Sequence, residues 1–364
     1  MKVDRKINIP LYMQVYESLL KAIRENRYRS GELLPSEREL AALFGVDRLT
    51  VRRALEILVT EGVVEKKAGL GSRLKNFSSP HWPNVSTRGI AFILPRTVNL
   101  IDRITEPFNS CLFYRIEKEV KEKGYSLIYT TLSDEEPFPP LLREDAVAGI
   151  LFVSQIPKRF IQEARNLNIP AVVVNNDDDC FPAVIADREQ GAFEGVKHLI
   201  SLGHRRIAFI SGIPSYSTSQ ACLAGYQKAL AEAGLEQKGQ ILKEGNWTFD
   251  GGYQCMKEII EEADDLPTSI FACNDMTALG AMEAIRESGL SVPGDISILG
   301  VDDIEQCTHY KPKLTTVRVD SEPIARAACQ SLFCAIETGQ TQNLKIIVPT
   351  RLVVRESVSP PREN

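Results

Sequence analysis

Two arginines one helical turn apart are the strongest chemical signal in the sequence. Arg48 and Arg52 lie four residues apart, and Thr50 and Arg53 flank them. Residues four apart share one face of an α-helix, and a guanidinium can donate two hydrogen bonds to the O6 and N7 atoms of guanine. If the other face is buried, this face can enter a DNA major groove. The alternative is an ordinary surface helix with a solvated basic face.

The neighbouring residues predict the helix-turn-helix that would present such an arginine face. Ser36 and Glu39 fit a capping box, which begins a helix at Pro35 or Ser36, and Gly45 can end that helix in a left-handed turn. Asp47 can cap the next helix, so a three-residue turn joins the two helices. The inner faces are expected to comprise Leu40, Leu43 and Phe44 on one helix, and Val51, Ala54, Leu55 and Leu58 on the other.

A helix before this pair and a hairpin after it complete the predicted unit. Apolar residues recur every four positions between Leu11 and Ile23, which predicts an amphipathic helix. After Gly62 the sequence predicts a short hairpin with a basic, Gly-rich tip, which we expect to lie along a phosphate strand or in a minor groove. Arg38 can reach a phosphate, because the first helix of such a motif crosses the DNA backbone. The tip contains Lys66, Lys67, Gly69 and Gly71.

Charge is divided unevenly along the chain. Residues 1–76 contain 15 Lys and Arg against 10 Asp and Glu, a net charge of +5, whereas the remaining residues contain 28 against 38, a net charge of −10. Charges more than ~10 Å apart are largely screened in physiological salt, so the acidic part does not cancel the field of the basic part. The asymmetry indicates a polyanionic partner for residues 1–76 alone.

Residues 10–75 resemble the winged helix-turn-helix of the GntR family of bacterial regulators. The resemblance is carried by PLYMQVYESLLKAI, SGELLPSERELAALFGVDRLTVRRALEILVTEGVV and GLGS. It implies that Arg38, Arg48, Thr50 and Arg52 contact double-stranded operator DNA, with the wing at residues 69–71 against the adjacent groove. Two positions depart from the family pattern: Asp47 stands where serine is usual and would repel a phosphate, and Leu70 occupies a wing position that is often polar or basic.

A different pattern begins after a polar, proline-containing stretch at residues 77–87, which we interpret as a linker. Short apolar strands then alternate with amphipathic helices, as in parallel α/β sheets covered on both faces. The length of this part favours two sheets. The strands are expected near residues 89–94, 126–130, 149–153, 171–174, 206–210, 269–272 and 297–301.

Polar residues follow several of these strands and predict a ligand pocket. Ligands of open α/β sheets bind beyond the carboxyl ends of the strands, where carboxylates and amides could accept hydroxyl groups and an indole could stack on a sugar. The alternative is that Asp and Asn serve there as helix caps. The candidates are Asn109, Ser110, Asp187, Trp247, Asn274 and Asp302.

Residues 88–358 resemble the effector domain of the LacI/GalR repressors, which is similar to type I periplasmic sugar-binding proteins. The motifs are GHRRIAFISG, CLAGYQKALAEAG, SIFACNDMTALGAMEAI, GLSVPGDISILGVDDIE, KPKLTTV and PTRLVVRES. The resemblance implies two lobes with ligand between them, one at about 88–187 and 317–343 and the other at about 188–316 and 344–356. The implied ligand contacts are Ser110 or its neighbour, Asp187, Trp247, Asn274 and Asp302.

One departure within this body concerns the charge of the pocket. The family usually has arginine three residues before the glycine of AGY, and this chain has Cys222 there. We therefore expect a pocket without its usual cationic anchor. A GntR-type head on a LacI/GalR-type body resembles the AraR-type regulators, but this departure and the long loop at residues 95–108 argue against inferring arabinose.

The remaining features exclude several other classes. The sequence has no membrane-length apolar stretch, no signal-peptide core and no nucleotide, zinc-protease or serine-hydrolase motif; its eight scattered cysteines suit a reducing compartment. A solute-binding receptor would need a signal peptide, and an enzyme would need a nucleophile and a base. We therefore predict a cytoplasmic, homodimeric transcription regulator without catalytic residues, metal or cofactor. Its predicted fold is a winged helix-turn-helix plus two parallel α/β subdomains. Its predicted role is a repressor of a carbohydrate-utilisation operon that leaves the operator DNA when a small sugar-like effector closes the cleft between the lobes.

Overall fold

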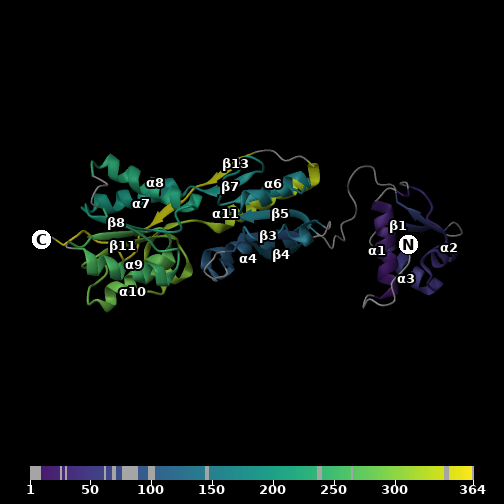
Figure 1. Cartoon of the computed structure of the whole chain (residues 1–364), viewed down its shortest axis with the longest axis horizontal. Helices are drawn as coiled ribbons and strands as arrows, with labels where there is room; N and C mark the ends of the chain where they lie inside the picture. The colour runs from purple at the N-terminus through teal and green to yellow at the C-terminus, as the bar shows by residue number, and fades with distance from the viewer. Residues whose placement is uncertain are drawn as a thin grey trace. The chain divides into compact units, whose positions relative to one another are not determined.

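The computed structural model divides the chain into two units, residues 1–87 and 88–364. We call them the head and the body and describe each by itself (Figure 1). The predicted linker, Gly69 and the side chain of Lys67 lie outside what the structure describes. The described residues are 10–24, 27–28, 31–60, 63–67, 71–75, 89–96, 103–143, 147–235, 240–263, 265–339 and 344–362.

The head has the predicted order of three helices followed by an antiparallel hairpin. Ser36 caps the second helix: its side chain accepts from the Glu39 N–H, and the Glu39 carboxylate accepts from the Ser36 N–H at 2.8 Å. Gly45 ends that helix with a φ of 69°, a left-handed conformation that glycine adopts without steric cost. The elements are α1 (Leu11–Arg24), α2 (Glu37–Phe44), α3 (Arg48–Thr60), β1 (Val64–Lys67) and β2 (Gly71–Leu74).

The head has its own apolar core, and one predicted member of it is wrong. The inner face of α3 is buried as predicted, but Leu43 of α2 is 48% exposed. Successive helical residues are turned by about 100°, so Leu40, Ala41 and Phe44 form one arc and Leu43 falls about 60° outside it. Ala41 takes the inner position that we predicted for Leu43.

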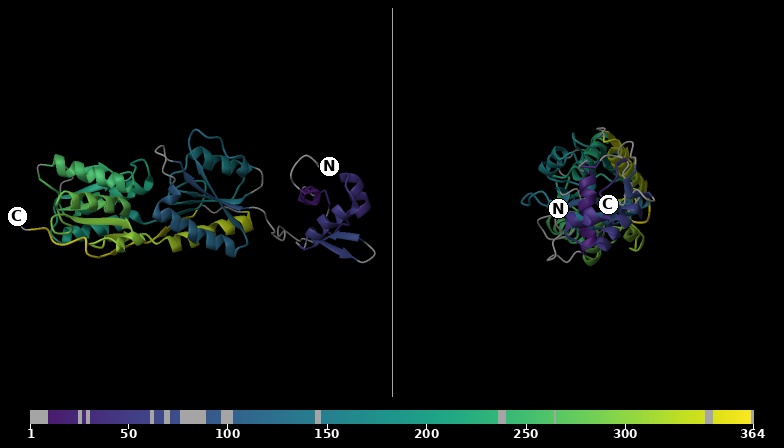
Figure 2. Two further views of the ribbon diagram at one scale, coloured as in Figure 1. Left: turned by 90° about the horizontal axis from the view of Figure 1, so that it is seen from below. Right: turned by 90° about the vertical axis from the view of Figure 1, so that its right-hand side faces the viewer.

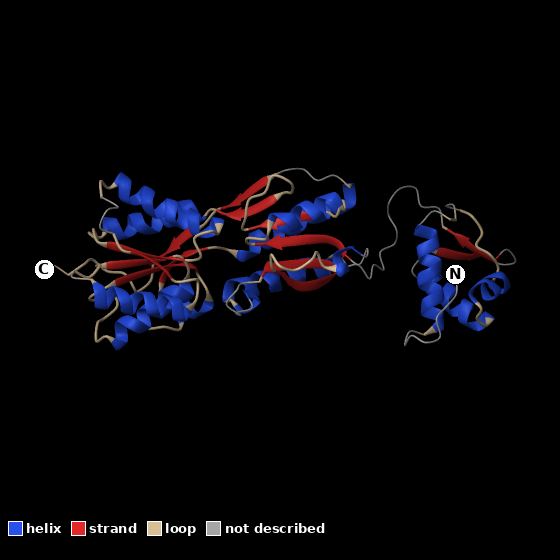
Figure 3. Cartoon of the chain, in the orientation of Figure 1, coloured by secondary structure: helices blue, strands red, loops and turns tan. Residues whose placement is uncertain are grey.

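The first sheet of the body is entirely parallel, in the order β13-β7-β6-β5-β3-β4. Alternate residues of β3 belong to two different buried clusters, so helices cover both of its faces. Figure 3 shows this sheet between its helices. The elements are β3 (Gly89–Pro95), η1 (Arg103–Thr105), α4 (Pro107–Glu122), β4 (Ser126–Leu132), α5 (Pro140–Arg143), β5 (Val147–Val153), α6 (Lys158–Asn166), β6 (Ala171–Val174), β7 (Ala183–Ala186), α11 (Ser321–Thr338) and β13 (Lys345–Val348).

The second sheet has the order β14-β12-β11-β10-β8-β9 and is parallel except for β14. In Figure 1, α7 and α8 lie on one side of it and α9 and α10 on the other. Among the described residues, no helix is long and apolar enough to cross a membrane. The elements are α7 (Arg188–Ser201), β8 (Ile207–Ser211), α8 (Ser217–Glu232), β9 (Leu242–Glu244), α9 (Phe249–Glu262), β10 (Ser269–Ala272), α10 (Asp275–Glu287), β11 (Ser297–Asp302), η2 (Glu305–Thr308), β12 (Thr315–Arg318) and β14 (Arg351–Val353).

The chain passes between the two sheets three times, after β7, β12 and β13. Two expected lobe boundaries therefore need correction. β12 pairs with β11 in the second sheet, although residues 317 and 318 were expected in the first lobe. β13 pairs in parallel with β7 from Lys345↔Ala183 to Val348↔Ala186, although residues 344–348 were expected in the second lobe. The reason is that β13 completes the edge of the first sheet before the chain crosses.

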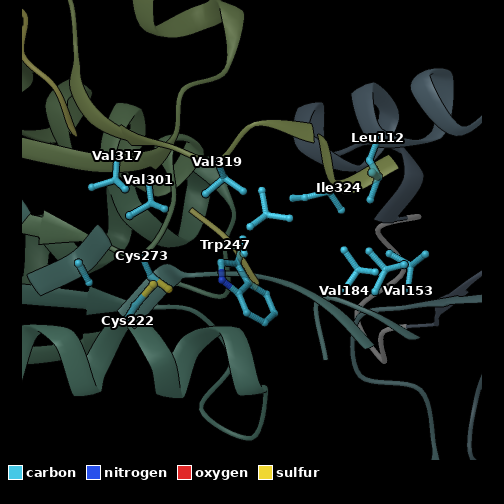
Figure 4. Close-up of a cluster of buried hydrophobic side chains, with 14 of the residues drawn as sticks. Leu112, Val153, Val184, Cys222, Trp247, Cys273, Val301, Val317, Val319 and Ile324 are labelled. Atoms are coloured by element: carbon cyan, nitrogen blue, oxygen red, sulfur yellow. The ribbon is translucent and has the colours of Figure 1, made fainter. Parts of the chain in front are cut away.

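One apolar cluster extends through both lobes of the body and the crossing segments. Leu112 and Val153 of the first lobe belong to it, as do Val301 and Val317 of the second. Figure 4 shows these residues on either side of Trp247 and Val319, and the left view of Figure 2 shows the crossing strands between the lobes. The two lobes of the body therefore share one apolar core.

Candidate DNA-reading face and effector cavity

The predicted reading residues lie on the outer side of α3. The side chains of Arg48 and Arg52 are 65% and 47% exposed, and Arg53 and Arg38 are exposed as well. The opposite side of α3 is buried in the core of the head. The division of α3 into a buried face and a basic face is therefore as predicted.

Glu37, which sequence reasoning missed, binds Arg52 and lies near Arg48. The Arg52 guanidinium donates to the Glu37 carboxylate from Nε at 3.1 Å and from Nη2 at 2.8 Å, and Arg48 Nη2 lies 4.0 Å from the same carboxylate. The hydrogen bond from Arg52 lowers the pKa of Glu37 below its usual value. Glu37 is the first residue of α2, so the turn between the helices brings it to α3. It orients Arg52 while offsetting part of the positive charge of the face.

Asp47 and Thr50 are bound to each other at the start of α3. The Thr50 N–H and hydroxyl donate to the two oxygens of Asp47 at 2.8 and 2.9 Å, and these bonds lower the pKa of Asp47. Asp47 therefore caps the helix, as its position predicted. The Thr50 hydroxyl donates to this cap, and a DNA phosphate only accepts hydrogen bonds, so a hydrogen bond from this hydroxyl to a phosphate would require the cap to rearrange. In the wing, Gly71 begins β2 with a φ of 99°.

In the body, a small cavity lies between the lobes at the carboxyl ends of the strands. Its volume is about 40 Å³, room for about one water, whereas ligand pockets commonly reach 300–1,000 Å³. The two lobes therefore leave little space between them at these residues. From the first lobe it is lined by Arg103, Glu106, Phe108, Asn109, Val153, Ser154 and Asn175, and from the second by Arg188, Thr218, Trp247, Asn274 and Asp302.

Unusual backbone conformations concentrate at this cavity. Seven non-glycine residues of the described chain have a positive φ, and four of them line the cavity: Ser154, Asn175, Trp247 and Asp302. Such conformations cost of order 1–3 kcal/mol each and cluster at ligand-binding sites. The cavity is therefore a candidate binding site on backbone geometry as well as on side-chain chemistry.

Four of the predicted effector residues meet at this cavity. Asn109 donates to the Glu106 carboxylate at 2.9 Å, and Asn274 donates to the Trp247 carbonyl at 3.0 Å while capping α10. Asp302 accepts from Arg188, and Trp247 packs edge-to-face on Tyr216 with ring centroids 4.9 Å apart. Asn274 thus caps a helix and also lines the cavity, so the two alternatives considered for Asp and Asn at strand ends both apply to it.

The other three predicted residues lie elsewhere. Ser110 lines an adjoining cavity of about 670 Å³ that also contacts Asp302. Asp187 is outside the cavity lining; it caps α7 by accepting from the Gln190 N–H, and its main chain bonds to Val348 and Thr350 where two crossing segments meet. Its role in this structure is therefore to join the crossing segments.

Cys222 is also outside the lining and is fully buried. Its thiol donates a hydrogen bond to the sulfur of Cys273, and this hydrogen bond together with burial raises the pKa of Cys222. Figure 4 shows the two sulfurs facing each other beside Trp247. A pair of buried cysteines thus occupies the position where the family usually has an arginine.

The family's usual arginine is absent at position 222, but two arginines reach the cavity from other positions. Arg188 directly follows Asp187 and begins α7, and Arg103 lies in the loop that we noted only for its length. The strand-end reasoning collected carboxylates, amides and an indole and passed over the arginine next to Asp187. Arg103 carries no comparable sequence signal, since only the fold brings its loop to the cavity.

Each of these arginines is paired with one carboxylate. Arg188 Nη2 donates to Asp302 at 2.7 Å, and Arg103 Nε lies 3.1 Å from Glu106. Burial raises the pKa of Asp302 and of Glu106, against the opposing effect of their arginines. The Arg103 guanidinium also lies 4.7 Å from the Trp247 ring centre and 5.2 Å from that of Tyr216, so it crosses from the first lobe to the second.

The arrangement suits recognition of a small polar molecule. It offers cationic donors, carboxylate and amide acceptors, and aromatic surfaces. In the described part of the chain, no group of three or more His, Cys, Asp or Glu side chains is placed to hold a metal ion.

Comparisons with known proteins agree with both units. Residues 11–74 match the family model "Bacterial regulatory proteins, gntR family", and residues 196–358 match "Periplasmic binding protein-like domain". The probable HTH-type transcriptional repressor ExuR of Bacillus subtilis is 32% identical over 333 residues, which cover 88% of this chain and 97% of that protein.

Solved structures of LacI-family regulators resemble the body. A regulator from Enterococcus faecium with bound ribose has a TM-score of 0.69 and 28% identity, over 76% of this chain and all of the other. A Lac repressor dimer bound to operator and the anti-inducer ONPF has a TM-score of 0.66 and 26% identity, over 76% of this chain and 96% of the other.

Proposed function

Because this chain belongs to the family of ligand-responsive bacterial transcriptional repressors that includes its Bacillus subtilis relative, with a GntR-type head and a periplasmic-binding-protein-like body, we propose that it represses a carbohydrate-utilisation operon. A small sugar-like effector enters the cavity between the lobes and releases the operator. The chain acts in the cytoplasm, as a homodimer, and without catalysis of its own.

The observation that carries this proposal is the cavity shared by the two lobes. Arg103 and Glu106 come from one lobe, and Arg188, Trp247 and Asp302 come from the other. A molecule held by both sets has a different affinity for open and closed arrangements, and it can shift that equilibrium by at most this difference. At about 40 Å³ the closed cavity is too small for a sugar, so the lobes part to admit the effector and settle on it in a new arrangement.

The head converts this change in lobe arrangement into a change in operator binding. Two-fold symmetric proteins read operators whose half-sites match their own symmetry, and the solved LacI-family relative above is a dimer on operator DNA. In this account Arg48 and Arg52 read bases, and the spacing of two heads sets whether both half-sites are bound at once. A change in lobe arrangement alters that spacing and weakens operator binding.

The test begins with the full chain and DNA of random sequence. Repeated selection of bound duplexes gives an operator, and fluorescence anisotropy then measures its affinity during titration with sugars, sugar acids and sugar phosphates. We expect at least one compound to weaken operator binding by tenfold or more. If compounds that bind the body leave operator affinity unchanged, the proposed function is contradicted.

Two variants locate the effect in the cavity. Trp247→Ala and Asp302→Asn are expected to bind operator normally and to require at least tenfold more effector for release. Arg286→Gln is a matched control, because Arg286 lies on α10 with its side chain 69% exposed and paired with Glu283. Normal release from both cavity variants would place the effector site elsewhere.

A further inference from the structure

We propose that Cys222 and Cys273 are a redox-active pair: a small hydroperoxide oxidises their two thiols to a disulfide, and this bond alters the wall of the cavity between the lobes at Trp247. The structure describes all eight cysteines of the chain, and all of them are free. Neither operator nor effector takes part in this chemistry, so it holds or fails independently of the proposed function.

Two different elements bring the two sulfurs together. Cys222 lies on the buried side of α8, and Cys273 directly follows β10. The Cys273 N–H donates to the Ile210 carbonyl at 2.9 Å, which fixes its main chain at the end of the sheet. The Cys222 thiol donates a hydrogen bond to the Cys273 sulfur, and Figure 4 shows the two sulfurs facing each other. The two atoms that would form the disulfide are therefore already in contact.

Three hydrogen-bond donors converge on the Cys273 sulfur. Besides the Cys222 thiol, the Gly212 N–H and the Trp247 side chain donate to it. A Cβ atom at Gly212 would lie 2.1 Å from Trp247 Nε1, so only glycine lets the indole approach the main chain beside this sulfur. Hydrogen bonds donated to an ionised group favour its charged form. The site is therefore built to hold a thiolate, which is the nucleophilic form of cysteine.

Electrostatics assign a different role to each cysteine. The hydrogen bond from Cys222 and the positive charge of Arg188 lower the pKa of Cys273 to about 7, although burial opposes them. The same hydrogen bond and burial raise the pKa of Cys222. Near neutral pH a share of Cys273 is therefore thiolate, whereas Cys222 keeps its proton. Cys273 attacks the oxidant, and Cys222 completes the disulfide.

The other buried cysteines do not have this environment. Burial raises the pKa of Cys255 and Cys307, and it raises the pKa of Cys329 to about 12. Buried cysteines that stay protonated are inert. Cys111 and Cys334 are exposed, so they react with any oxidant in solution and serve as internal standards.

The reaction proceeds in two balanced steps. The Cys273 thiolate attacks one oxygen of the hydroperoxide, the O–O bond breaks, and the other oxygen leaves and takes up a proton. Cys273 is then a sulfenic acid. The Cys222 sulfur attacks the Cys273 sulfur, the S–S bond forms as the S–O bond breaks, and the Cys222 proton leaves with the hydroxide as water. The two thiols are oxidised by two electrons, and the hydroperoxide is reduced to an alcohol or to water.

The size of the oxidant decides whether it reaches the pair, because both sulfurs are buried. Trp247 contacts the Cys273 sulfur and Asn274 follows Cys273 in the chain, and both line the cavity between the lobes. This cavity of about 40 Å³ has room for about one water. Hydrogen peroxide is only slightly larger than water, so it is the oxidant that this route admits best. A bulky hydroperoxide with the same O–O bond should react more slowly.

The disulfide would change how Trp247 is held. Asn274 donates to the Trp247 carbonyl at 3.0 Å, and the neighbouring Cys273 sulfur accepts from the Trp247 side chain. A disulfide sulfur accepts a hydrogen bond more weakly than a thiolate, because charged acceptors form the stronger bonds. Oxidation therefore loosens the indole while Asn274 keeps the main chain in place, which alters one wall of the cavity.

Peptide mapping of the full chain tests the disulfide directly. The chain is treated with hydrogen peroxide, the remaining thiols are alkylated, and the digest is analysed by mass spectrometry. We expect a linked peptide that contains Cys222 and Cys273 and that dithiothreitol separates. A reduced pair in a sample whose Cys111 and Cys334 are oxidised would overturn the proposal.

A second oxidant tests the route to the pair. Cumene hydroperoxide should oxidise the pair at least tenfold more slowly than hydrogen peroxide does, when each rate is divided by that of exposed Cys111. An equal ratio for the two oxidants would overturn the route through the cavity.

Substitutions test the roles of the two cysteines. Cys222→Ala should leave a sulfenic acid on Cys273 that dimedone labels, whereas Cys273→Ala should give no label on Cys222. Cys329→Ala is the matched control, because it removes another buried thiol, and it should form the disulfide normally. Thermal unfolding checks the fold of each variant, and mapping of the unaltered chain decides if a variant does not fold. A label on Cys222 in Cys273→Ala would contradict the assigned roles.

Fluorescence tests the effect on the cavity wall. The sequence has two tryptophans, so Trp82→Phe leaves Trp247 as the only one. Hydrogen peroxide should change the fluorescence of this variant at the rate at which the linked peptide forms, and dithiothreitol should reverse the change. Unchanged fluorescence in a sample that contains the disulfide would overturn the effect on Trp247.

Discussion

At the scale of single residues, the head depends on a carboxylate that offsets its own reading face. Glu37 accepts three hydrogen bonds from Arg52 and lies near Arg48. Arg48 and Arg52 have the clearest signal in the sequence, whereas Glu37, which offsets their charge, has none. The four-residue spacing predicted Arg48 and Arg52, but only the turn between α2 and α3 brings Glu37 to them.

Arg52→Ala is expected to reduce preference for the operator, because it removes a base-reading guanidinium. Each bidentate arginine–guanine pair discriminates by ~1–3 kcal/mol, so we expect at least a fivefold loss in the ratio of operator to random-DNA affinity. Effector binding should be unchanged. Unchanged operator preference by anisotropy would disprove the assignment of the reading helix.

Glu37→Gln is expected to raise affinity for all DNA, because it removes a negative charge from the head. It should also lower preference for the operator, because Arg52 loses the carboxylate that orients it. Glu56→Gln is the matched control, because it removes the same charge from α3 at a carboxylate paired with Lys66. Anisotropy against operator and random duplexes at two salt concentrations separates the variants. Identical behaviour of the two would show that Glu37 acts through charge alone.

Asp275 is expected to make the stability of the body depend on pH. Burial, with a contribution from nearby Asp302, raises its pKa to about 7, although Thr316 and the Ile304 N–H donate to it. The folded state therefore binds this proton more tightly than the unfolded state, and the free energy of unfolding falls as the pH rises from about 4 to 7. Asp275→Asn should flatten this slope in calorimetric unfolding between pH 5 and 7.5. An equal slope in both proteins would contradict the assignment.

At the scale of elements, local rules predicted what local chemistry determines. The capping box at Ser36, the left-handed Gly45 and the Asp47 cap depend on a few neighbouring residues, and each is present. Leu43 was misplaced because spacing alone does not show where the centre of a buried arc lies. The position of β13 depends on pairing with the distant β7, which no local pattern carries.

Ser36→Ala should destabilise the head by about 1 kcal/mol, the usual effect of losing an N-cap side chain. Glu37 directly follows this cap as the first residue of α2, so loss of the cap should disturb its contact with Arg52 and weaken operator binding as well. Circular dichroism of the full chain measures the unfolding of the head. Thr248→Ala removes a comparable cap from α9 in the body and should leave operator binding unchanged; equal effects of both variants on DNA binding would contradict this explanation.

At the scale of the whole molecule, the sequence could predict the cavity but not its charge. Strand-end reasoning found Asn109, Trp247, Asn274 and Asp302, because parallel strands end at a common edge. It also placed Asp187 in the cavity, and the family resemblance placed Cys222 there, whereas the two residues lie at a crossing segment and in the core. Arg103 arrives from a loop, so no periodic pattern could have revealed it.

The central claim is that the effector cavity and the operator-binding head share one equilibrium. Such coupling is reciprocal: if the effector weakens operator binding by some factor, the operator weakens effector binding by the same factor. The most direct measurement is therefore calorimetric titration of effector into the full chain, with and without saturating operator. The account predicts weaker effector binding on operator by the factor seen in the release assay. Equal effector affinity in the two titrations would contradict it.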